Sequence, residues 1–68
     1  MHAADVDKRH IERTWATLTT LNRSVSIDDL ARLLNYTHHW TKCTLDHMRR
    51  HASASELAIL DTLIVDHN

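Results

Sequence analysis

The chain has 68 residues and a formal net charge of −1, and both values limit its architecture before any motif is considered. This length allows one small domain over residues 1–68 and excludes nucleotide-binding α/β folds and barrel enzymes. A single cysteine, Cys43, excludes an internal disulfide. The first residues lack a signal-peptide pattern, and no apolar run approaches the roughly 18 residues of a membrane span. We therefore expect a soluble cytoplasmic protein.

The composition predicts an all-α fold. Glycine and proline are absent, whereas β-rich folds normally need glycine-containing hairpin turns. We therefore expect a compact bundle of three to four short helices. Phenylalanine and glutamine are also missing, which is compatible with a designed chain. The eight threonines, several of them in helical stretches, argue against a design optimised for helix propensity.

Two helices are predicted in the first half of the chain. The first covers about residues 7–21, is capped by Asp5 or Asp7, and repeats apolar residues at spacings of three and four. The second begins after Ser26, which is followed by an acidic residue three positions later, as in a capping box. Asn35 can adopt the left-handed conformation that ends a helix.

Two more helices are predicted in the second half. Thr37 can cap a helix that runs to about His51, and Ser53 with Glu56 forms a capping-box pattern before the last one. The last helix is apolar on most sides, so it is either enclosed by the other helices or meets a partner. Its apolar residues are Leu57, Leu60, Leu63 and Ile64, flanked by Ile59 and Val65.

This apolar arc supports the first functional hypothesis, a small non-enzymatic helical regulator that acts through protein–protein contacts as a homodimer. Tryptophan contributes disproportionately to binding energy at interfaces. The expected partner-binding residues are Trp40, Leu57, Leu60 and Ile64. An enzyme is not expected, because phosphate-binding loops need glycine and a monomer of this size offers no evident water-excluding pocket. We also expect no cofactor and no small-molecule substrate.

The second hypothesis is DNA binding. Residues 27–42 resemble the helix-turn-helix of small transcriptional regulators, with Ala31 at the helix crossing and Asn35 at the turn glycine. Leu30, Leu34 and Tyr36 match apolar core positions of that family. The resemblance implies a dimeric regulator whose His38, His39 and Lys42 face the major groove, with Arg49 or Arg50 near phosphates.

The pattern departs from this family in the second helix of the motif. The two apolar positions that the family expects there are occupied by Thr41 and Thr44. The apolar residues present are Trp40, Leu45 and Met48, which follow a different register, and we expect the helix to carry them together with Thr44. The slightly acidic chain also offers a weak electrostatic footprint for nucleic acid.

The third hypothesis is a metal-dependent helical assembly. His39, Cys43, His47 and His51 recur at every fourth residue, so each step drifts by about 40° around a helix. Neighbouring pairs could share a metal ion, but all four side chains could not meet one ion, so a second helix or chain would have to complete a zinc site. The alternative is that these residues only border the packed face, with Cys43 acting as a small hydrophobe.

Overall fold

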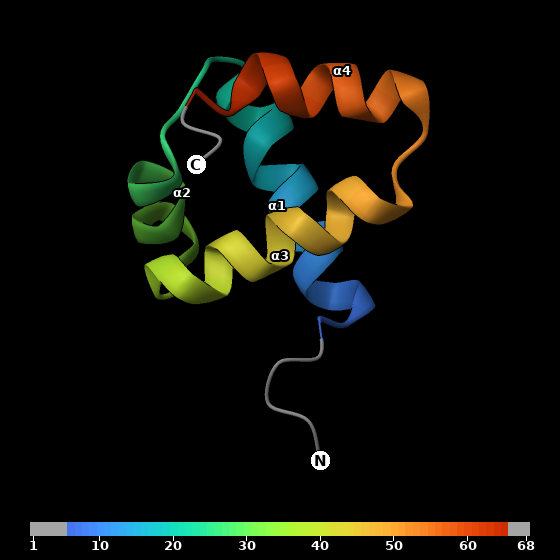
Figure 1. Cartoon of the computed structure of the whole chain (residues 1–68). Helices are drawn as coiled ribbons and strands as arrows, with labels where there is room; N and C mark the ends of the chain where they lie inside the picture. The colour runs from blue at the N-terminus through green and yellow to red at the C-terminus, as the bar shows by residue number, and fades with distance from the viewer. Residues whose placement is uncertain (1–5, 66–68) are drawn as a thin grey trace.

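The protein is described by a computed structural model, which places residues 6–65. Within this range the chain forms four helices, α1 (Lys8–Leu21), α2 (Ile27–Leu34), α3 (His38–His51) and α4 (Ala54–Leu63) (Figure 1). The predicted all-α fold is confirmed. None of these helices is long and apolar enough to cross a lipid bilayer.

Each helix begins where a capping residue was predicted. In every case the side chain of the N-cap residue accepts a hydrogen bond from the backbone N–H three residues later, which satisfies one of the free donors of the first turn. At α4 the bond is reciprocal, because the Glu56 carboxylate also accepts from the Ser53 backbone N–H at 2.9 Å. The four N-cap residues are Asp7, Ser26, Thr37 and Ser53.

Asparagine ends the first two helices in place of glycine. Asn22 has φ = 51° and Asn35 has φ = 59°, both in the left-handed region. Among non-glycine residues asparagine tolerates this conformation best, because its short side chain can hydrogen-bond locally. The stop predicted at Asn35 is confirmed, and Asn22 plays the same role at the end of α1.

The helices enclose one hydrophobic core. It receives side chains from every helix and from the α1–α2 connection, and Ile11, Trp15, Leu21, Tyr36 and Leu63 pack against it while partly buried. Its buried members are Leu18, Val25, Ile27, Leu30, Leu34, Leu45, Met48, Leu60 and Ile64.

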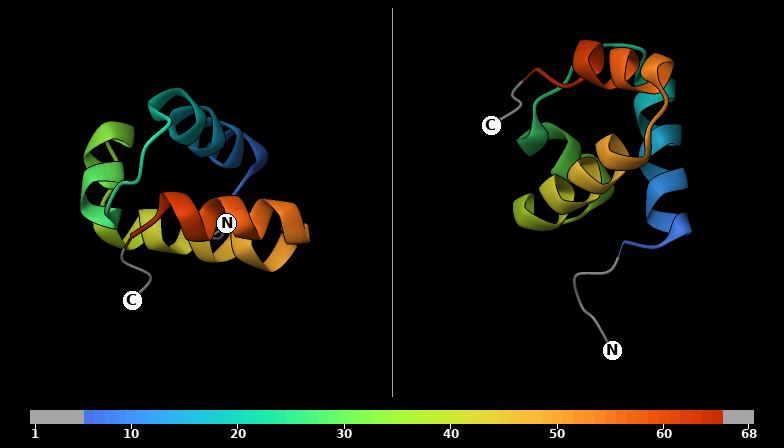
Figure 2. Two further views of the ribbon diagram at one scale, coloured as in Figure 1. Left: turned by 90° about the horizontal axis from the view of Figure 1, so that it is seen from above. Right: turned by 45° about the vertical axis from the view of Figure 1, so that its right-hand side comes forward.

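The helices α1, α2 and α3 pack against one another, and α4 packs against α3. Figures 1 and 2 show α4 running back over α3 in the opposite direction, with α2 at one end of the pair and α1 across it. A charged contact joins α3 to α4, since Arg49 Nη1 lies 2.7 Å from Asp61 Oδ1. The two antiparallel helices are thus joined by an ion pair within the molecule.

The chain leaves the helix after Leu63 and pairs with the α1–α2 connection. Val25 and Ile64 form an isolated parallel β-bridge. The Val25 N–H donates to the Leu63 carbonyl at 2.8 Å, and the Val65 N–H donates to the Val25 carbonyl at 3.0 Å. The predicted helical arc through Val65 is therefore wrong in its last turn. The Ile64 N–H still donates to the Leu60 carbonyl, but the Leu63 carbonyl and the Val65 N–H pair with Val25 instead of continuing the helix.

Candidate functional site

The α2–turn–α3 unit has a short and fully bonded turn. The Asn35 N–H donates to the carbonyls of Ala31 and Arg32, and the Tyr36 N–H donates to the Ala31 carbonyl at 2.9 Å. Thr37 then caps α3. Ala31 is buried at 5% exposure, consistent with a small side chain where α2 approaches α3. The local features of the helix-turn-helix resemblance are therefore present in the structure.

Leu45 and Met48 are buried in α3, and so are the two threonine positions of the resemblance. Thr41 and Thr44 are buried at 0% and 1% exposure, whereas Trp40 is only half-buried. Each threonine hydroxyl donates to the carbonyl four residues earlier, at 2.9 Å in both cases. Threonine thus behaves here as a β-branched core residue whose polar atom is satisfied within its own helix. With Leu45 and Met48, these threonines form the buried face of α3.

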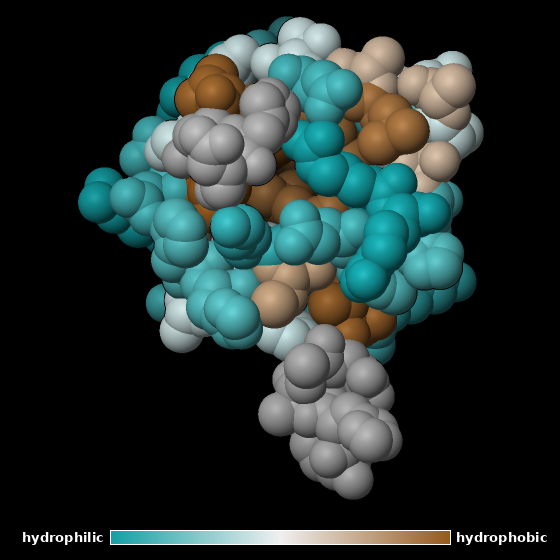
Figure 3. Space-filling view, viewed as in Figure 1, coloured by the Kyte–Doolittle hydropathy of each residue, from teal (hydrophilic) through white to brown (hydrophobic). Residues whose placement is uncertain are grey.

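The opposite face of α3 is polar. His38, His39 and Lys42 are exposed near its N-terminus, and Asp46 and Arg50 are exposed further along. In Figure 3 hydrophilic residues cover much of the surface over this helix. The structure therefore brings together, on one helix face, the three side chains that the resemblance implied for the major groove.

Two of the predicted nucleic-acid contacts already have partners within the protein. His38 Nδ1 lies 2.6 Å from Asp28 Oδ1, at the start of α2. Arg49 is bound to Asp61 and its side chain is only 27% exposed. Arg50 is exposed, so of the two arginines it is the better placed to reach a phosphate.

A cluster that the sequence analysis missed fixes α1 against the turn. His10 Nδ1 lies 2.9 Å from the Tyr36 hydroxyl, and the His10 ring meets the Tyr36 and Trp40 rings edge-on, with centroids 5.6 and 5.4 Å apart. The Arg13 guanidinium lies over the Tyr36 ring, 5.1 Å from its centroid. Trp40, predicted to bind a partner, therefore contacts α1. No local sequence pattern points to this cluster, because His10 lies far from Tyr36 and Trp40 in the sequence.

The residues predicted for partner binding on α4 do not share one exposed face. Leu60 and Ile64 are buried at 0% and 1% exposure and belong to the core. They are enclosed within the chain, so they offer no surface to a partner. Leu57 is half-buried, and the apolar surface that remains near the end of α4 comes from Ile59 and Val65, which are 44% and 60% exposed.

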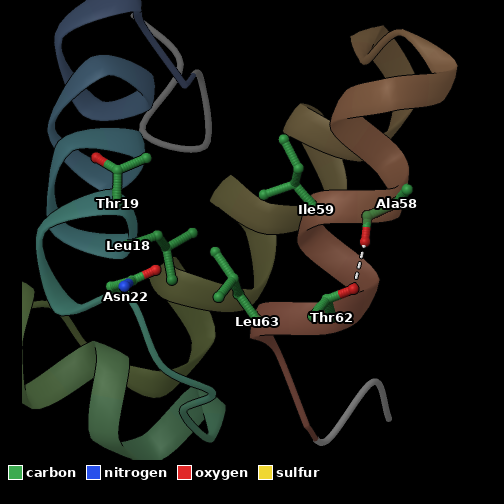
Figure 4. A pocket seen from close by; sticks show the side chains of 7 residues that line it. All are labelled: Leu18, Thr19, Asn22, Ala58, Ile59, Thr62 and Leu63. Carbon is green, nitrogen blue, oxygen red and sulfur yellow. Dashed lines mark hydrogen bonds between the residues drawn. The ribbon is translucent and has the colours of Figure 1, made fainter.

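An open apolar groove separates α1 from α4. Its volume is about 410 Å³. Figure 4 shows Ile59 and Leu63 pointing from α4 toward α1, where Leu18 and Thr19 form the opposite wall. The Thr62 hydroxyl donates to the Ala58 carbonyl at 2.9 Å, so its hydrogen bond is made within α4. The full lining comprises Leu18, Thr19, Asn22, Ala58, Ile59, Thr62 and Leu63.

The histidine–cysteine column divides into two pairs. Cys43 Sγ lies 3.5 Å from His39 Nε2, and the His47 and His51 rings lie 4.6 Å apart between centroids. Among residues 6–65, no group of three or more His, Cys, Asp or Glu side chains could hold a metal ion. A complete site within the described part of one chain is therefore not formed.

No protein-family model matches this chain, and no curated protein or solved structure matches it.

Proposed function

We propose that the protein binds double-stranded DNA through the α2–turn–α3 unit, with α3 entering the major groove. The observation that carries the proposal is the burial of Thr41 and Thr44. Their burial sets the rotation of α3 about its axis, and this rotation leaves His39 and Lys42 on the exposed face. An exposed N-terminal half of the second helix is the part that helix-turn-helix proteins present to base edges.

The exposed face carries groups that suit base recognition. A lysine can donate to the O6 and N7 acceptors of guanine, and a carboxylate such as that of Asp46 can accept from the amino group of cytosine. The imidazole of His39 offers one donor and one acceptor when neutral. Lys42 and Asp46 therefore favour contacts with G·C pairs.

The few exposed cations on α3 predict a weak electrostatic contribution to the free energy of DNA binding. Lys42 and Arg50 are exposed on α3, whereas Arg49 is bound to Asp61. If two or three cations contact phosphates, log K should fall by about 2–3 units for each tenfold rise in salt. Binding should therefore be detectable at low salt and lost early as salt is added.

Fluorescence anisotropy with a random-sequence duplex over a range of salt concentrations tests the proposal. The perturbing variant is Lys42→Ala. The matched control is Arg23→Ala, which also removes one exposed positive charge. Arg23 lies in the α1–α2 connection next to Ser24, whose hydroxyl donates to the Thr62 carbonyl of α4 at 3.0 Å. This contact places the control near α4, away from the N-terminus of α3 (Figure 1).

We expect Lys42→Ala to weaken binding, because a contact with base edges is lost, while Arg23→Ala leaves the affinity unchanged. Equal losses in the two variants would show only a diffuse attraction of charges. Absence of binding at the lowest salt, with a folded protein, would contradict the proposal.

The α1–α4 groove supports a second candidate function, self-association. A two-fold symmetric contact needs one surface that is complementary to itself. Ile59 is 44% exposed and also lines the groove, so the recess and its exposed apolar side chain belong to one surface. In this candidate, the grooves of two copies face each other and Ile59 of each copy packs against the other.

Sedimentation equilibrium of the wild type, Ile59→Asp and Leu33→Asp tests this candidate. Leu33 is a matched control because it is 49% exposed but belongs to α2 and does not line the groove. We expect a dimer for the wild type and the control and a monomer for Ile59→Asp. A monomeric wild type, or equal dissociation of both variants, would refute the candidate.

A further inference from the structure

The last two turns of α3 hold two imidazole rings side by side. His47 is half-buried and His51 is exposed, and they are one helical turn apart. Their ring centroids are 4.6 Å apart and their planes make an angle of 41°. Both rings therefore occupy the same patch of surface before any ligand arrives.

This separation suits two ligands of one transition-metal ion. Zinc binds imidazole nitrogen at about 2.0–2.1 Å with tetrahedral geometry, which places the centroids of two ligating rings about 5 Å apart. The observed 4.6 Å is close to this value, so the two rings already lie at about the separation that a shared ion requires.

The position on the helix also favours a cation. The pair lies in the C-terminal part of α3, where the unpaired carbonyl groups make the helix end negative. Arg49, in the same last turn, is already bound to Asp61. Asp61 offsets the charge of Arg49, so Arg50 is the arginine of this turn whose repulsion a divalent ion would meet.

We propose that His47 and His51 form a two-histidine binding site for a divalent ion of the zinc, nickel or copper class. Each ring donates a nitrogen lone pair from its neutral form, and water completes the coordination. Imidazole suits these metals, whereas magnesium and calcium prefer oxygen ligands. Any proton on the ligating nitrogens is released when the metal binds. The site does not depend on the proposed DNA binding.

Isothermal titration of the full chain with Zn²⁺ at neutral pH tests the site. The perturbing variants are His47→Ala and His51→Ala. The matched control is His39→Ala, which alters the other pair of the column, His39 with Cys43. Because His47 is half-buried, circular dichroism should confirm that each variant is folded. His51 is exposed, so its variant keeps the test valid if His47→Ala does not fold.

We expect the loss of either ring to weaken Zn²⁺ binding by about tenfold or more. With both rings present, an ion bound to one imidazole meets the other at a high effective concentration, and this advantage is lost when one ring is removed. His39→Ala should leave the affinity within about twofold of the wild type. Zn²⁺ should also raise the melting temperature of the wild type, because only the helical state brings the two rings together. The proposal is overturned if binding is absent at about 1 mM Zn²⁺, or if only His39→Ala abolishes it.

Discussion

Replacement of Thr41 by valine tests the packing of α3 most directly. The Thr41 side chain is fully buried, and its hydroxyl donates to the Thr37 carbonyl at 2.9 Å. The Thr41 backbone N–H donates to the same carbonyl at 3.0 Å. The carbonyl therefore keeps a partner when the hydroxyl is removed, and the substitution leaves no buried polar group unpaired.

The expected change in the free energy of unfolding follows from two contributions. Losing the hydroxyl bond costs about 0.5–1.5 kcal/mol net, with the desolvation of the hydroxyl already included. A buried methyl group in its place contributes about 0.8 kcal/mol. Thr41→Val should therefore lie within about 1 kcal/mol of the wild type. Thr41→Ala, which gains no methyl group and leaves a small cavity, should be less stable by about 1–2 kcal/mol.

Urea unfolding followed by circular dichroism measures both changes. The comparison requires equal m values, since a different slope would indicate an altered denatured state. If valine destabilised the protein by more than about 1 kcal/mol, the hydroxyl would have a role beyond its own helix and the assignment of Thr41 to a simple core position would be wrong. The valine variant should also bind duplex DNA as the wild type does, because the hydroxyl is not on the exposed face.

Three further outcomes are expected. Leu60→Ala should cost about 2–5 kcal/mol and unfold much of a protein whose total stability is about 3–10 kcal/mol, whereas Leu33→Ala, at a position that is 49% exposed, should change the melting temperature little. Asn35→Ala should lose about 1–2 kcal/mol in urea unfolding because φ is 59°, and Asn35→Gly should lose almost nothing. The hydrogen bond from the His10 backbone N–H lowers the pKa of Asp7, so the charged cap stabilises the fold above about pH 4 and this contribution disappears as the pH falls through the lowered pKa. Thermal melts should therefore show Asp7→Asn less stable than the wild type at neutral pH and equal to it in strong acid.

The sequence alone determined where the helices begin and how the second one ends. Caps such as Ser26 and Ser53 act through hydrogen bonds within three residues, and the left-handed stop at Asn35 depends only on its own backbone. Such interactions are complete within one turn of chain, so neighbouring residues suffice to predict them. The all-α fold followed from the same local preferences and from the absence of glycine.

Only the tertiary structure decided which side of each helix is enclosed. Leu60 and Ile59 are adjacent and both apolar, yet the first is fully buried and the second is 44% exposed. Hydrophobic periodicity places Leu60 in the apolar arc and Ile59 at its flank, but it cannot decide which part of a helix that is apolar on most sides is enclosed. The burial of Thr41 is likewise not evident from the sequence, because threonine counts as polar although its hydroxyl is here satisfied within its own helix. Burial depends on the angle at which helices distant in sequence meet, and that angle is set by the packing of the whole core.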